Sequence, residues 1–178
     1  MAQPAHSWPG RARTVVSGIE WISEAIGKGF AWLTLGSVLV CFAVVVLRYG
    51  FGIGHVWMQE LYVWFHAMVF TGCAGYALKH NAHVRVDIFY SSMTTRKQAW
   101  VDLAGACVLV IPWMAFTAWV AWPWMMRSYG MGESSGASDG MPAIWVLKAM
   151  LIVMTAVLIL QATAMALRSL LILSGHKE

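Results

Sequence analysis

Four long runs without a charged side chain constrain the fold of this chain more than any other feature of its sequence. The runs contain no Asp, Glu, Lys or Arg, and they cover residues 29–47, 61–78, 103–126 and 149–167. A helix crosses the hydrocarbon core of a bilayer with about 20 apolar residues, within a range of about 17–25. Backbone groups in lipid must be satisfied inside the segment, and the runs lack the alternation of barrel strands. The sequence therefore predicts an all-α integral membrane protein with four transmembrane helices.

The composition argues against soluble classes of protein. Hydrophobic residues make up 60% of the chain and charged residues only 11%, whereas soluble domains carry about 25% charged residues. A water-soluble enzyme and a nucleic-acid-binding protein are therefore not expected. The net charge of +4 is explained by basic residues in cytoplasmic loops. The three cysteines are far apart and show no ligand spacing, so neither a disulfide framework nor a zinc site is indicated.

We expect a single membrane domain over residues 1–178. Its predicted parts are a cytoplasmic arm with an interfacial helix (1–28), span 1 (29–48), span 2 (60–79), a cytoplasmic loop (80–99), span 3 (101–126), a periplasmic loop (127–142), span 4 (143–168) and a cytoplasmic tail (169–178). Within the arm, Val15, Ile19, Ile22 and Ile26 recur at helical spacing. They indicate either a short interfacial helix or a helical extension of span 1. A short interfacial segment is also expected between spans 2 and 3.

The distribution of basic residues predicts the orientation of the spans. The arm, the second loop and the tail together carry nine Lys and Arg, and the other side carries three. Cytoplasmic loops are enriched in Lys and Arg, so both termini are predicted to be cytoplasmic.

Charged residues near the span ends mostly match the helix dipole, with cations at carboxyl ends and carboxylates at amino ends. Lys148 is the exception, because it lies in the first turns of the fourth span. Arg48, Glu60 and Lys148 are predicted to lie at similar depth near the outer surface. A pair between Glu60 and Arg48 or Lys148 would offset the cost of a charge near lipid.

Few polar side chains fall within the spans. His66 is predicted to be a hydrogen-bonded packing residue, and Gln161 is expected either to join spans or to bind a partner. Gly72 and Gly75 give a smooth helix face, either for packing within the chain's own bundle or for a partner helix.

These residues do not indicate catalysis or a bound cofactor. Two-histidine haem ligation needs a His on each of two facing spans, and only the second run contains one. No nucleophile with a neighbouring base is visible. A self-contained transporter is not favoured, because no internal repeat or broken helix is evident and Pro112 alone is a weak signal. We therefore predict a non-enzymatic membrane subunit without cofactor or metal. A membrane anchor of a redox complex is the alternative.

Residues 48–96 resemble the small membrane subunit of the TRAP transporters, the tripartite ATP-independent periplasmic carriers (the DctQ-like subunit). The resemblance is carried by Arg48, Trp57-Met58-Gln59-Glu60-Leu61, Trp64, Gly72 and His83-Val84-Arg85-Val86-Asp87. Gln59 stands where the family has the first Glu of a pair, and Met93-Thr94-Thr95 stands where a proline is common. The size and the four-span layout agree over nearly the whole chain.

The resemblance implies a scaffold in the inner membrane. In that family a large membrane subunit carries the substrate and sodium sites, and a periplasmic binding protein delivers an organic acid. The small subunit packs against the large one and does no catalysis. Trp57, Glu60, Trp64, His83 and Asp87 match the family's signature positions, and we expect them to shape the subunit and its contact with the large subunit. With Arg48, Gly72, Gly75 and Lys148 they are the candidate interface residues.

Two loops leave alternatives open. The second loop is either an extended turn into an amphipathic interfacial segment or a solvated loop. In the first case Asp87 pairs with Arg85, Arg96 or Lys79, or caps a segment that begins near Ser91. The third loop is rich in Gly and Ser, and it either contacts the binding protein or is an inert connector.

Overall fold

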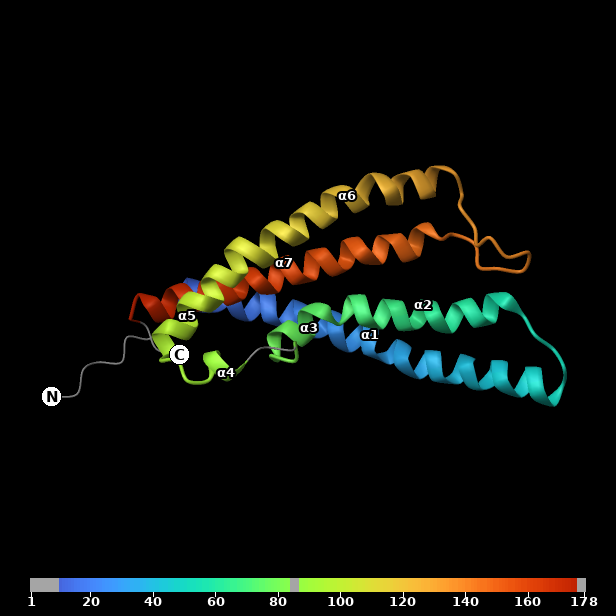
Figure 1. Cartoon of the computed structure of the whole chain (residues 1–178), viewed down its shortest axis with the longest axis horizontal. Coiled ribbons are helices and arrows are strands. Elements are labelled where there is room, and N and C mark those ends of the chain that lie inside the picture. Colours follow the sequence, from blue (N-terminus) through green and yellow to red (C-terminus); the bar gives the residue numbers. More distant parts are fainter. Residues whose placement is uncertain (1–9, 84–86, 176–178) are drawn as a thin grey trace.

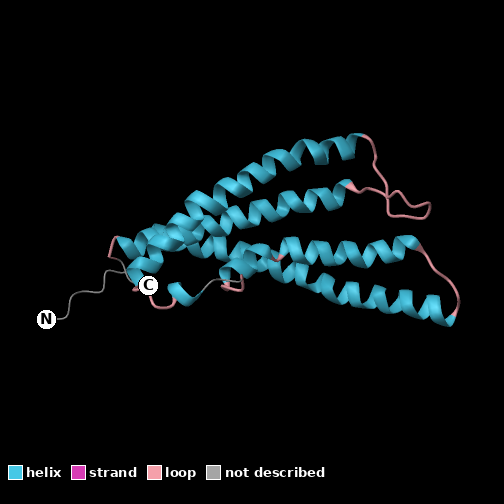
Figure 2. Cartoon of the chain, in the orientation of Figure 1, coloured by secondary structure: helices cyan, strands magenta, loops and turns pink. Residues whose placement is uncertain are grey.

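A computed structural model describes residues 10–83 and 87–175, and every regular element in these ranges is helical (Figures 1 and 2). The elements are α1 (Gly10–Gly50), α2 (Val56–Gly72), α3 (Ala74–Lys79), α4 (Asp87–Tyr90), α5 (Thr95–Ala104), the π-helical turn η1 (Gly105–Val110), α6 (Ile111–Gly130) and α7 (Trp145–Leu173). Four continuous stretches are long and apolar enough to cross a membrane: Ala12–Gly50, Val56–Lys79, Thr95–Gly130 and Trp145–Leu173. The prediction of an all-α fold with four long apolar helices is confirmed.

Helix α7 is the centre of the bundle. Helices α1 and α2 form one hairpin, α6 and α7 form another, and α7 contacts α1, α2, α3, α5 and α6. The hairpins lie side by side in Figure 1, with the beginning of α1, the end of α7 and α3 gathered toward one end of the molecule, here called the inner end. The buried residues of α7 are mostly small: Met150, Thr155, Val157, Gln161, Ala162, Ala164, Ala166 and Ser169. Small side chains allow membrane helices to approach closely.

Helix α1 runs for 41 residues without a break. Residues 14–28 are therefore a helical extension of the first span, and residues 10–50 contain no separate interfacial helix. The reason is packing, because Val16 and Ser23 are buried inside the bundle. Gly27 is also buried, and a Cβ atom there would lie 2.4 Å from Cβ of Tyr76.

Two of the long helices are interrupted, although the sequence predicts unbroken spans. Cys73 separates α2 from α3, and its Sγ donates a hydrogen bond to the carbonyl of Gly27 at 3.3 Å. The turn η1 ends at Val110, two residues before Pro112. Proline lacks an N–H, and its ring clashes with the carbonyl four residues earlier. That carbonyl belongs to Val108, within η1, and a widened turn makes room for the ring.

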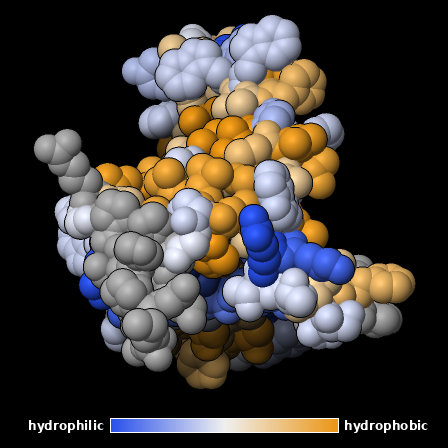
Figure 3. Space-filling model, turned by 90° about the vertical axis from the view of Figure 1, so that its left-hand side faces the viewer, coloured by the Kyte–Doolittle hydropathy of each residue, from blue (hydrophilic) through white to orange (hydrophobic). Residues whose placement is uncertain are grey.

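The outer surface of the bundle is strongly apolar. Trp32, Phe42, Phe70 and Trp119 are each more than 65% exposed, and Figure 3 shows hydrophobic side chains over much of the face that it presents. In water such a surface would promote aggregation, whereas in a bilayer it contacts lipid tails that are equally apolar. The exposed apolar side chains therefore agree with membrane insertion.

Candidate functional site

Glu60 attaches the loop between α6 and α7 to the second helix. It lies in the first turns of α2, and its carboxylate accepts a hydrogen bond from the backbone N–H of Met141 at 2.6 Å and another from the hydroxyl of Ser135. The N–H of Ser135 donates to the carbonyl of Met141 at 2.9 Å, so the loop is closed on itself at the same point. A carboxylate that accepts a backbone N–H forms a stronger bond than a neutral acceptor. Glu60 therefore helps to hold this loop over the start of α2, together with His55 just before the helix, whose Nδ1 lies 3.1 Å from Oδ2 of Asp139 in the same loop.

The prediction that Glu60 forms an ion pair with Arg48 or Lys148 is wrong. In the described part of the chain, neither Arg48 nor Lys148 pairs with it: Arg48 is exposed at the end of α1, and Lys148 pairs with Glu133 at 2.5 Å. The physical reason is that the third loop folds back over the helix ends. It supplies hydroxyl and amide donors to Glu60 and a separate carboxylate to Lys148.

Lys148 is stabilised on two sides at the start of α7. Besides Glu133, its ammonium nitrogen lies 4.4 Å from the centre of the Trp124 ring, a cation–π distance. The hydrogen bond from Lys148 lowers the pKa of the Glu133 carboxyl, which lies in the loop outside the spans. These two contacts explain why Lys148 is tolerated at the amino end of α7, where the helix dipole disfavours a cation.

Two ion pairs tie α1 to its neighbours at the inner end, and a third lies within α1. Glu24 bonds Lys79 at 2.5 Å and Lys28 at 2.7 Å, and Glu20 bonds Arg168. Lys79 ends α3 and Arg168 lies near the end of α7, so the pairs join α1 to both helices. The sequence prediction treated these cations as matches to the helix dipole and missed the carboxylates facing them. The available signal was the spacing of Glu20 and Glu24, which places both on one face of a helix.

The two glycines of the small-residue face pack inside the chain's own bundle. A Cβ atom on Gly72 would lie 2.3 Å from Cγ of Phe30 in α1. A Cβ atom on Gly75 would lie 3.0 Å from the carbonyl oxygen of Val157 in α7. Of the two alternatives for this face, packing within the bundle is the one that the structure shows.

The other signature positions are spread along the second span and the loop after it. Trp57 is 39% exposed at the start of α2, and Trp64 is 7% exposed and packs inside. His83 donates from Nε2 to the carbonyl of Ala74 at 3.3 Å. Asp87 begins α4, but its side chain, like residues 84–86, lies outside the described residues, so its expected partners stay a prediction. The signature positions thus lie along α2 and in the segment that follows α3, and they do not form a single cluster.

Of the two polar side chains singled out within the spans, His66 differs from expectation, and the expected role of Gln161 stays a prediction. His66 is exposed on the outer face of α2 and makes no hydrogen bond within the described part of the chain, so the prediction of a hydrogen-bonded packing residue is wrong. Gln161 is only 3% exposed, and its Oε1 has no hydrogen-bond partner among the described residues. The sequence pattern does not show how α2 is rotated about its own axis, and in the structure this rotation places His66 on the exposed face of the helix.

The described residues contain no group of three or more His, Cys, Asp or Glu side chains that could hold a metal ion. The polar groups that are described mainly fix loops and helices to one another. The arrangement is that of a helical bundle in which the loop between α6 and α7 is tied to the start of α2.

Comparison with known protein families gives a match over most of the chain. The model of the family described as tripartite ATP-independent periplasmic transporters, DctQ component, matches residues 37–171. No curated protein and no solved structure matches the chain. The match covers well over half of the chain. It includes the whole of α2, α3, α5 and α6, residues 145–171 of α7 and residues 37–50 of α1.

Proposed function

Because the chain belongs to the DctQ component family of the TRAP transporters, we propose that it is the small scaffold subunit of a secondary transporter and is itself non-catalytic. In this proposal a large membrane subunit carries the substrate, and a periplasmic binding protein delivers it. The substrate is a small organic acid, and the driving force is an ion gradient, with sodium as the ion. The chain lies in the inner membrane with both termini in the cytoplasm.

The observation that carries the scaffold role is the position of His66. It lies six residues after Glu60, about 9 Å along the helix axis, and therefore within the apolar part of the span. Val63 and Phe70 flank it on the same helix face and are 52% and 71% exposed. A polar group that faces hydrocarbon is costly and marks a contact with a polar partner. A helix of the large subunit that hydrogen-bonds His66 would remove this cost.

Site-specific photocrosslinking tests this contact in the assembled transporter. A photoreactive amino acid is placed at position 66 or 70 of α2, and the three components are expressed together. Position 119 on α6 is the matched control, because Trp119 is 72% exposed on a different helix. We expect adducts with the large subunit from positions 66 and 70 and not from position 119. Adducts from position 119 alone would place the partner on α6 and refute the role given to His66.

The substitution His66→Phe tests the energetic part of the proposal. An interhelical hydrogen bond in a membrane contributes about 0.6 kcal/mol on average, or about threefold in affinity. We expect His66→Phe to weaken co-purification of the large subunit by about that factor. Val63→Phe, which changes the same face without removing a hydrogen-bonding group, is the control for shape.

A further inference from the structure

Two neighbouring basic side chains lie in the first turn of α5, at the inner end of the bundle (Figure 1). Arg96 and Lys97 are both exposed, and neither forms an ion pair within the part of the chain that the structure describes. By contrast, Lys79 and Arg168 at the same end are each held by a carboxylate of α1. The first turn of α5 contains no acidic residue either. The described chain therefore leaves two adjacent positive charges without a compensating anion.

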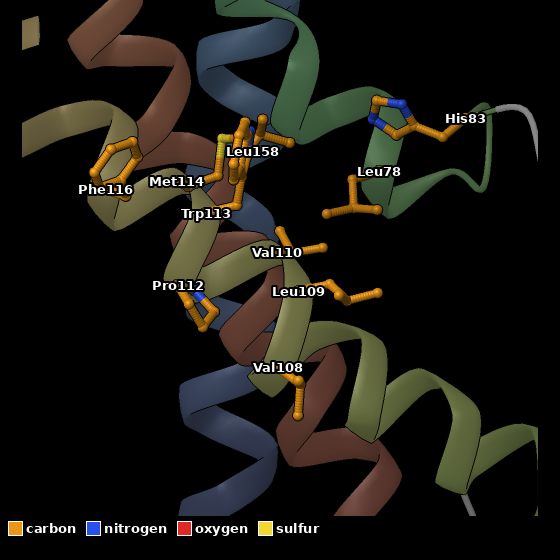
Figure 4. Close-up of a pocket in the computed structure, with 10 residues that line it drawn as sticks. All are labelled: Leu78, His83, Val108, Leu109, Val110, Pro112, Trp113, Met114, Phe116 and Leu158. Carbon is orange, nitrogen blue, oxygen red and sulfur yellow. The ribbon is translucent and has the colours of Figure 1, made fainter. Parts of the chain in front are cut away.

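The exposed surface of this helix changes from basic to apolar within one turn. Trp100 lies four residues after Arg96, and residues four apart are neighbours on one helix face. Val101 stands in the same relation to Lys97. The two apolar side chains are 59% and 46% exposed. Further along, Val108 on the turn η1 is 69% exposed (Figure 4). Such a change is typical of the boundary between lipid headgroups and hydrocarbon, where Trp is enriched.

The short helix α4 adds a second exposed aromatic ring near these cations. The hydroxyl of Tyr90 donates a hydrogen bond to Oδ2 of Asp102 at 2.7 Å. The side chain of Gln98 donates from Nε2 to the carbonyl of Tyr90 at 3.0 Å. These bonds attach α4 to the first turns of α5, and the neighbouring Phe89 is 71% exposed. An exposed ring is therefore held close to the basic turn.

We propose that Arg96, Lys97, Trp100 and Phe89 form a binding surface for one anionic glycerophospholipid of the leaflet at the inner end. The phosphate accepts hydrogen bonds from the two basic side chains, and the glycerol and the upper parts of the acyl chains lie against the two rings. A phosphocholine headgroup brings its own cation, which the two basic residues repel, whereas phosphoglycerol brings a negative charge alone. The surface goes beyond the scaffold role and does not depend on the transported substrate.

Lipid binding to the purified full-length chain in detergent tests this surface. Native mass spectrometry gives dissociation constants for phosphatidylglycerol and phosphatidylcholine with the same acyl chains, and for glycerophosphoglycerol, which has no chains. Each basic residue near an anionic lipid contributes about fivefold in affinity. We therefore expect phosphatidylglycerol to bind about 25-fold more tightly than phosphatidylcholine, and we expect this preference to shrink as the salt concentration rises. Glycerophosphoglycerol should bind far more weakly, because it has no chain to contact the rings.

Single substitutions then locate the surface. Arg96→Gln and Lys97→Gln should each lower the preference for phosphatidylglycerol about fivefold. Lys97→Arg should keep the preference, because it keeps the charge. Arg127→Gln is the matched control: it removes the same charge from an exposed residue near the end of α6, at the opposite end of the bundle. This control should leave the preference unchanged.

Four results would overturn the proposal. Equal affinity of the wild-type chain for the two lipids would show that the surface does not select charge. An equal loss of preference in Arg127→Gln would make the effect one of net charge. Glycerophosphoglycerol binding as tight as that of the lipid would indicate a site for a free phosphate. An unchanged preference in both Arg96→Gln and Lys97→Gln, together with weaker co-purification of the large subunit, would assign the surface to a protein partner.

Discussion

The close approach of α2 to α1 at Gly72 gives a prediction with a defined magnitude. A Cβ atom at this position would lie 2.3 Å from Cγ and 2.4 Å from Cδ2 of Phe30. These atoms belong to the root and side of the ring, so the whole ring or the backbone must move. Overpacking a core in this way costs about 1–3 kcal/mol. We therefore expect Gly72→Ala to lower the free energy of unfolding by about that amount.

Gly29→Ala in α1 is the matched control, because no heavy atom lies within 4 Å of a Cβ there. In a helix interior, Ala is favoured over Gly by roughly 0.5–1 kcal/mol, so this variant should be neutral or more stable. SDS titration in mixed micelles, followed by far-ultraviolet circular dichroism, measures both. Phe30→Leu should partly rescue Gly72→Ala, since a smaller side chain relieves the clash. Equal stability of Gly72→Ala and Gly29→Ala would refute the packing described for the two helices.

Other predictions concern the loops. Glu60→Ala should loosen the third loop, so that the amides of this loop exchange their hydrogens faster. Glu60→Gln should have a smaller effect, because it keeps a hydrogen-bond acceptor. Equal exchange rates in the two variants would show that Glu60 does not hold the loop. The hydrogen bond from Lys148 lowers the pKa of Glu133. The pair should therefore stabilise the fold fully at pH values above the ordinary pKa of Glu, and this stabilisation should be lost as the pH falls through the lowered pKa. Lys148→Met should flatten that acid-side dependence of thermal stability. Reporter fusions should be cytoplasmic after Lys97 and periplasmic after Gly136, and the opposite pattern would invert the topology.

The helices could be predicted from the sequence because the bilayer imposes them. A run of about 20 residues without charge has few stable alternatives in lipid, and the four runs correspond to the four long helices. The Gly72 and Gly75 spacing also indicated a tightly packed face. The family resemblance rested on short motifs around Trp57 and Glu60, and the match over residues 37–171 confirms it.

The partners of individual side chains could not be predicted, because they depend on rotation and loop conformation. Nothing in the pattern around Glu60 shows that a Gly- and Ser-rich loop will fold back and donate to it. The periodicity of residues 14–28 left an interfacial helix and an extension of span 1 open, and it does not show that Ser23 is buried or that Glu24 reaches Lys79.

Uptake by reconstituted components tests the central claim most directly. Labelled organic-acid uptake into liposomes with an imposed sodium gradient is measured with all three components and with each one left out in turn. The scaffold assignment predicts gradient-driven uptake by the complete set, little or none without this chain, and none by this chain alone. Robust uptake by this chain alone would contradict the assignment, and so would full uptake by the other two components in its absence.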